Sequence, residues 1–209
     1  MYGHILESVK HAKYLGITIS ADLKWNTHIQ QTAAKANKSL GFIRRNLKVQ
    51  SQTIKERAYQ TLIRPKLEYC CTVWDPFTNE NIKSLEKVQR RAARYVCNRH
   101  HNTSSVSEML DTMKWQTLQE RRLRTRLIMF HKIVNEKIAI PSQNVLQQSQ
   151  STTRSTNKES YRQIHCNKDS FKFSFFCQTI KDWNKLTPEI TKKQYYRKLQ
   201  GCTHTRRAP

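Results

Sequence analysis

The stretch that decides the fold is Leu67-Glu68-Tyr69-Cys70-Cys71-Thr72-Val73-Trp74-Asp75-Pro76, then a break at residues 77–79, then a run from Glu80 to Arg99. Within this run, apolar residues recur at spacings of three, four and three: Leu85, Val88, Ala92 and Tyr95. This spacing is typical of one face of a helix. Residues 69–76 supply large rings for the core that this face covers, and Asp75-Pro76 ends the preceding element.

The same run carries a basic stripe at spacings of four, three and four: Lys83, Lys87, Arg90 and Arg94. At about 100° per residue, the centre of the basic stripe lies roughly 150° from the centre of the apolar stripe. We therefore predict a helix that buries one face in a core and turns the opposite face toward an anion.

A second helix with the same division of faces is expected after Asn26 or Thr27, either of which can cap it. Its apolar positions are Ile29, Ala33, Ala36, Leu40, Ile43 and Leu47. Its basic stripe consists of His28, Lys35, Lys38 and Arg45, again roughly 150° away. A single basic stripe is usually a solvated face, whereas two of the same design favour a shared basic groove.

The charge balance is strongly basic. The chain of 209 residues has 38 Lys and Arg against 15 Asp and Glu, a formal net charge of +23. Such a balance favours polyanions, with nucleic acid first and an anionic membrane surface second, although a basic surface without a specific partner stays open. The presence of only 4 Gly and 5 Pro favours long helices over many tight turns.

The residues do not indicate a catalytic site. Only Glu108 and Asp111 lie within four positions of each other among the acidic residues, whereas a metal-dependent polymerase or nuclease needs convergent carboxylates. No Gly-rich phosphate loop, His-Glu-x-x-His motif or serine elbow occurs. Ordinary small apolar or surface cysteines are favoured over a zinc site, because the candidate ligands do not have the usual ligand spacing. These candidates are His165, Cys166, Cys177, Cys202 and His204. We expect reduced thiols and no cofactor.

The remaining segments add shorter elements. Two strands are expected over 4–9 and 13–19, joined at 10–12, and a helix over 52–63 that Pro65 kinks or ends. Residues 67–74 are expected to continue as helix. Thr103 or Ser104 is expected to cap a short helix, and Thr117 and Glu120 fit a capping box. The apolar face of the helix that follows is Leu123, Leu127, Phe130 and Val134.

We therefore predict a mainly α fold in five parts. Residues 1–20 form a β-hairpin, 21–141 a helical thumb-like bundle, 142–163 a polar linker, 164–201 a small aromatic-rich annex, and 202–209 a basic tail without regular structure. The annex carries a helix over 174–184 and is too small to fold alone, so its aromatic cluster is expected to dock on the bundle.

Several segments resemble, in the right order, reverse transcriptases of jockey-like non-LTR (LINE) retrotransposons. Lys13-Tyr14-Leu15-Gly16 resembles the strand that closes the palm. The segments that resemble the helical thumb are Leu23-Lys24-Trp25-Asn26-Thr27-His28-Ile29, Leu62-Ile63-Arg64-Pro65-Lys66-Leu67-Glu68-Tyr69, Val73-Trp74-Asp75-Pro76, Leu85-Glu86-Lys87-Val88-Gln89-Arg90-Arg91-Ala92-Ala93-Arg94 and Leu118-Gln119-Glu120-Arg121-Arg122. Those that resemble the region near the C-terminus are Ser174-Phe175-Phe176, Thr179-Ile180 and Trp183-Asn184-Lys185-Leu186.

The resemblance implies a thumb, which holds the template–primer duplex while another part of the polymerase performs the chemistry. The family's Tyr-x-Asp-Asp motif belongs upstream of Lys13 and does not occur there. We therefore expect a partial copy of a mobile element, with no catalytic residue and no polymerase or endonuclease activity of its own. The expected partners are RNA and DNA, held by sugar–phosphate contacts from the two basic stripes. No membrane or small-molecule partner is expected.

Other interpretations stay open at this point. The chain is alternatively a helical module that binds protein, an active reverse transcriptase, or a remnant without function. We see no signal peptide and no apolar run of the ~20 residues that a membrane span needs. An intracellular protein, nuclear or cytoplasmic, is expected, and only the resemblance points to the nucleus.

Overall fold

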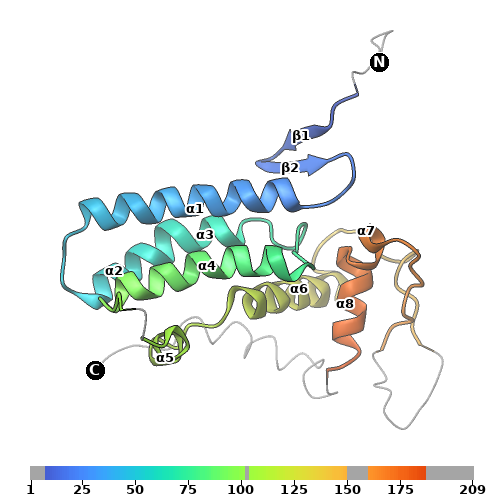
Figure 1. The fold of residues 1–209 in the computed structure, drawn as a ribbon. Helices are drawn as coiled ribbons and strands as arrows, with labels where there is room; N and C mark the ends of the chain where they lie inside the picture. Colours follow the sequence, from blue (N-terminus) through green and yellow to red (C-terminus); the bar gives the residue numbers. More distant parts are fainter. Residues whose placement is uncertain (1–7, 102–103, 150–159, 187–209) are drawn as a thin grey trace. The chain divides into compact units, whose positions relative to one another are not determined.

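The computed structural model describes residues 8–101, 104–149 and 160–186, and the fold is mainly α with a short N-terminal β-hairpin, as predicted (Figure 1). The chain divides into two compact units, Met1–Arg121 and Arg122–Pro209. The elements of the first are β1 (His11–Tyr14), β2 (Ile17–Ser20), α1 (Asn26–Asn46), α2 (Gln52–Ala58), a π-helical segment η1 (Tyr59–Ile63), α3 (Arg64–Glu68), α4 (Asn79–Val96) and α5 (Val106–Thr112). Helix α6 (Leu118–Val134) begins in the first unit, and α7 (Asp169–Lys172) and α8 (Phe175–Trp183) belong to the second.

The hairpin is shorter and lies later in the chain than predicted. β1 and β2 pair antiparallel, with Tyr14 opposite Ile17, so the connection is the two-residue turn Leu15-Gly16. Both turn residues have positive φ, 45° and 85°, which is the geometry of a tight hairpin turn. The predicted joint at residues 10–12 is therefore wrong, because Gly16 makes the turn. Residues 4–7 of the first expected strand lie outside the described residues.

The core of the first unit forms where α1 packs against α4, with α3 beside α1 (Figure 1). Both predicted apolar stripes are confirmed as buried, apart from Leu47, which is half-buried. The alanines that lie on these faces have small side chains, which allows two helices to approach closely. The buried members of the two stripes are Ile29, Ala33, Ala36, Leu40, Ile43, Leu85, Val88, Ala92 and Tyr95.

The segment between α3 and α4 is a series of turns and not the predicted continuation of a helix. Helix α3 ends at Glu68, and Cys70 has a positive φ of 51°, which a helix does not tolerate. The turn brings the indole of Trp74 into the core, where it is fully buried. Its Nε1 donates to the Tyr69 carbonyl at 2.8 Å, so the one polar atom of this ring is satisfied.

Pro65 does not end its helix, and a π-helical turn precedes it. The Arg64 N–H donates to the carbonyl of Tyr59, five residues earlier, and η1 leads directly into α3. Pro65 has no N–H to donate, and widening the preceding turn is a known way for a helix to accommodate the missing bond.

The start of α6 is fixed as the sequence predicts. The Thr117 hydroxyl accepts from the Glu120 N–H at 3.1 Å, and the Glu120 carboxylate accepts from the Thr117 N–H at 3.1 Å. The capping box is therefore confirmed. The cap of α5 is Ser105, which accepts from the Glu108 N–H at 3.3 Å, and not Thr103 or Ser104. Thr103 lies outside the described residues.

Two aromatic rings support this region. Trp115 stacks on Tyr59, with ring centroids 4.3 Å apart, and its Nε1 donates to Glu56 at 2.9 Å. The Tyr59 ring is buried, and burial first, with the nearby charge of Glu68 second, raises the pKa of its hydroxyl well above the ordinary value. The chain between α5 and α6 is thereby held against the α2–η1 helix.

The second unit has its own apolar cluster, built from α6, α8 and the chain between them. Phe130 and Trp183 lie 5.0 Å apart, and Phe130 meets the edge of Tyr161 at 5.6 Å. The expected docking of the annex aromatics is thus made on the second half of α6. The predicted face is wrong at Leu123, which is 36% exposed, whereas Arg126 is buried and pairs with Asp182.

The boundaries of the units differ from the expected ones. The division falls between Arg121 and Arg122, inside α6, and not after residue 141. Part of the expected linker, residues 150–159, and the expected tail, residues 202–209, lie outside the described residues. In the described part of the chain, no helix has the length and apolar character that crossing a membrane requires.

His28 connects the hairpin to α1. Its ring is 5% exposed, and its Nδ1 accepts from the Thr18 N–H at 3.2 Å. Its ring also meets the edge of Trp74 at 4.9 Å. Burial, followed by the positive charge of Lys35, lowers the pKa of His28 below its ordinary 6.5. The folded state therefore favours the neutral form of the His28 ring.

We predict that acid weakens this contact. Because the pKa of His28 is lower in the folded state, the unfolded chain binds more protons, and the stability from His28 is lost as the pH falls through the folded-state pKa. The free energy of unfolding should fall as the pH is lowered below the ordinary histidine pKa of 6.5, as measured by urea unfolding and tryptophan fluorescence. His28→Asn, which keeps an acceptor for Thr18, should flatten that dependence.

The control for this prediction is His101→Asn, since His101 is an exposed histidine. It should keep the pH profile of the unmodified protein. If His28→Asn and the unmodified protein lose stability equally on acidification, the assignment of this pH dependence to His28 is wrong.

Candidate nucleic-acid interface

Among the residues that the structure describes, no carboxylate forms an ion pair with the basic stripe of α4. Lys83, Lys87 and Arg90 are exposed and Arg94 is half-buried. Ion pairs within the described ranges are made by other cations, among them Arg64, Arg121, Arg126 and Lys185. The charge on the outer face of α4 is therefore not neutralised by a described carboxylate.

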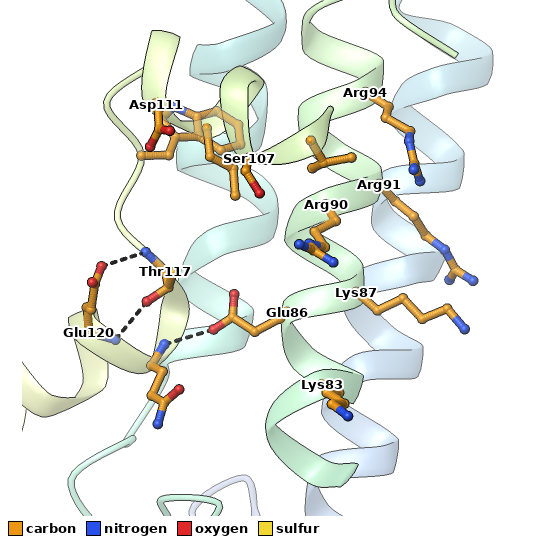
Figure 2. A pocket seen from close by; sticks show the side chains of 14 residues that line it. Lys83, Glu86, Lys87, Arg90, Arg91, Arg94, Ser107, Asp111, Thr117 and Glu120 are labelled. Atoms are coloured by element: carbon orange, nitrogen blue, oxygen red, sulfur yellow. Dashed lines mark hydrogen bonds between the residues drawn. The ribbon is translucent and has the colours of Figure 1, made fainter. Parts of the chain in front are cut away.

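A groove of about 750 Å³ runs along this face, between α4, α5 and the start of α6 (Figure 2). Its basic members all come from α4, and its acidic members lie on α4, α5 and α6. The cations are Lys83, Lys87, Arg90, Arg91 and Arg94. The acids are Glu86, Asp111 and Glu120. The cations of the groove thus come from one helix, whereas its acids come from three.

Two of the three acids that line the groove accept hydrogen bonds from backbone N–H groups. Glu86 accepts from the Gln119 N–H at 2.9 Å, and Glu120 accepts from the Thr117 N–H. Both carboxylates therefore lie at the start of α6, where free N–H groups and the helix dipole favour negative charge. Figure 2 shows Lys87 and Arg91 extending to the opposite side of α4. Arg90 lies on the same side of α4 as Glu86, so Lys87 and Arg91 are the cations that extend away from the acids of the groove.

Two members of the predicted α1 stripe, Lys38 and Arg45, are also exposed. The Arg91 guanidinium donates to the Asn37 amide oxygen at 3.1 Å, which marks the flank where α4 meets α1. From Asn37, Lys38 and Arg45 lie about 80–100° further round α1, on the side away from the core. From Arg91, Arg90 lies about 100° round α4, also away from the core. Lys38 and Arg45 on α1, like Arg90 on α4, therefore lie outward from the Asn37–Arg91 contact, on faces turned away from the core.

The other two members of the predicted α1 stripe lie elsewhere. His28 is buried against Trp74 and Thr18, so it has no surface with which to reach a phosphate. Lys35 is exposed but lies about 160° from Asn37 around α1, on the side of the helix away from the Arg91 contact. Residues 28 and 35 share a helical phase, which is why the spacing places His28 in the stripe. At His28, however, this face of α1 is covered by β2 and Trp74.

Arg91 also belongs to this surface, although it is not part of the predicted basic stripe. It is exposed, lines the groove and bonds to Asn37. In the sequence, Arg91 is marked only by its position next to Arg90. Its angle around the helix axis falls between the apolar and basic stripes. Only the packing of α1 against α4 shows on which side of the helix it lies. We define the basic surface as Lys38, Arg45, Lys83, Lys87, Arg90, Arg91 and Arg94.

The described ranges hold no group of three or more His, Cys, Asp or Glu side chains placed to bind a metal ion. Of the residues considered for zinc, Cys166 and Cys177 lie close together, with their sulfur atoms 3.3 Å apart. Cys202 and His204 lie outside the described residues.

No protein-family model, curated protein or solved structure matches this chain.

Proposed function

We propose that this chain binds nucleic acid through the sugar–phosphate backbone, using the basic surface of α1 and α4. The observation that carries the proposal is the row of cations on α4, which are exposed apart from the half-buried Arg94 and form no ion pair with a carboxylate of the described ranges. The buried face of the same helix fixes the orientation of this row. Lysine and arginine at a rigid helix face neutralise phosphates and release counterions, which gives affinity without reading the base sequence.

A duplex of RNA and DNA is the form of nucleic acid that we propose as the ligand. Its near A-form geometry has a wide, shallow minor groove and an accessible backbone, which suits contact by a two-helix surface. The resemblance to the thumb of jockey-like retrotransposon reverse transcriptases supports the same choice, because a thumb holds the template–primer duplex. On this proposal the chain is a non-catalytic part of such a polymerase.

The annex gives less support to the alternative of a protein-binding module. That alternative needs aromatic side chains left uncovered around residues 171–183. Phe171 is exposed, but Ile180 and Trp183 are buried against Phe130 within the second unit. Most of the aromatic cluster is thus used in its own core, whereas the cations of α4 have no such use.

The binding proposal predicts a strong dependence on salt. With about six phosphates engaged, the logarithm of the affinity should fall against the logarithm of the salt concentration with a slope near −5 for a duplex. Filter binding of a short RNA–DNA duplex at several salt concentrations measures this slope. A flat response contradicts the proposal, because it means that no counterions are released.

Charge-neutralising variants locate the surface. Lys87→Gln, Arg90→Gln and Arg91→Gln combined should weaken binding and reduce the steepness of the slope by about 2 to 3, since each lost phosphate contact removes about 0.9. The matched control is Lys10→Gln, Lys24→Gln and Arg57→Gln, which removes the same charge from exposed residues outside the groove. Equal losses from both sets would mean that net charge, and not this surface, binds the duplex.

The proposal also makes a prediction about catalysis. In a primer-extension assay on an annealed RNA template and DNA primer, the purified chain should retain the duplex without adding nucleotides. The proposed role is to hold the duplex, whereas nucleotide addition needs convergent carboxylates that bind divalent ions. An active reverse transcriptase in parallel reactions confirms that the substrate is competent. Robust extension by this chain would contradict the non-catalytic role and leave the binding proposal intact.

A further inference from the structure

A second basic feature of the first unit is a recess of about 270 Å³ between the end of α1, the start of α2 and the end of α4. The Lys55 side chain lines it and is only 4% exposed, whereas the other cationic residues of the recess are exposed. These other cations are Arg44 and Lys48, and His100 also lines the recess. No aspartate or glutamate is among the lining residues.

The ammonium group of Lys55 is held by neutral groups alone. It donates to the Asn98 amide oxygen and lies 5.0 Å from the centroid of the Tyr95 ring. None of the ion pairs between described residues includes it. Burying an ammonium group costs several kcal/mol, and contact with an aromatic ring offsets about 1 kcal/mol of this cost. The positive charge of Lys55 is therefore buried without a counter-charge from the residues that line the recess.

The walls of the recess are held by the chain itself. The Tyr95 hydroxyl donates to the Leu47 carbonyl at 2.9 Å, which ties α4 to the end of α1. Asn98 has a positive φ of 52°, a conformation that asparagine tolerates, and its side chain faces Lys55. Lys55 therefore has a fixed position between the two helix ends, with its ammonium at the lining of the recess.

We propose that this recess binds a phosphate group with at least three free oxygens, either inorganic phosphate or a phosphate monoester. Lys55 supplies the buried charge, and Arg44 and Lys48 close over the anion from the rim. A phosphodiester within a nucleic-acid strand carries a sugar on two of its oxygens and enters a small recess less readily. The proposal is independent of the α4 surface, since Lys55 does not line the groove there.

The test compares thermal unfolding of the full chain in sodium phosphate and in sodium chloride of equal ionic strength at neutral pH. With a Kd near about 1 mM, about 10 mM phosphate should raise Tm by about 5 °C over chloride. Lys55→Met should weaken phosphate binding at least about tenfold, because a charged hydrogen bond is lost, and so remove most of the shift. In chloride its Tm should be unchanged or higher, because the variant removes a buried charge.

Three further variants make the result specific. Lys24→Met removes an exposed charge outside the recess and should keep the full shift. Lys87→Gln with Arg90→Gln, on the α4 surface, should also keep it, which separates this site from the proposed nucleic-acid surface. Arg44→Gln with Lys48→Gln changes only exposed rim residues and should reduce the shift, even if Lys55→Met does not fold.

The source of the phosphate is identified with AMP and adenosine. A shift with AMP but not with adenosine supports a monoester ligand, and a shift with inorganic phosphate alone supports the free anion. If the unmodified protein gains no more stability from phosphate or AMP than from chloride, or if Lys55→Met gains as much as the unmodified protein, the proposal is overturned.

Discussion

The packing of α4 against α1 is the interaction on which the rest of the first unit depends. Leu85, Ala92, Ile29 and Ala36 are all fully buried where these helices meet. Burying a side chain the size of leucine contributes about 1.5–3 kcal/mol, whereas an exposed charged contact contributes about 1 kcal/mol or less. The apolar faces therefore determine how each helix is rotated about its own axis. The orientation of the basic surface is a consequence of that rotation.

The distribution of acidic residues explains why the α4 cations are unpaired. The chain has 15 acids for 38 Lys and Arg, and several acids already have structural partners. Glu68 pairs with Arg121, Asp182 pairs with Arg126, and the acids near α6 accept N–H groups at its start. Carboxylates are thus used where they hold elements in place. The surplus of positive charge is left on exposed helix faces, where a polyanion can neutralise it.

The sequence predicted what periodicity and capping determine, and missed what long-range packing determines. The two amphipathic helices, the Thr117–Glu120 box and the mainly α class follow from local spacing, and the structure has them. The burial of His28 depends on β2 and Trp74, which are distant in sequence. The start of the hairpin, the π-helical turn before Pro65 and the buried Lys55 likewise depend on neighbours that spacing does not reveal.

The most direct measurement of the central claim is lysine footprinting with an amine-reactive reagent and mass spectrometry, with and without an RNA–DNA duplex. If one side of the α1–α4 layer holds the duplex, Lys38, Lys83 and Lys87 become protected. Lys35, which is exposed on the far flank of α1, and Lys24, in the loop before it, keep their reactivity. Protection of Lys24 and Lys35 to the same extent as Lys83 and Lys87 would contradict the account, because the helix faces would then not direct binding.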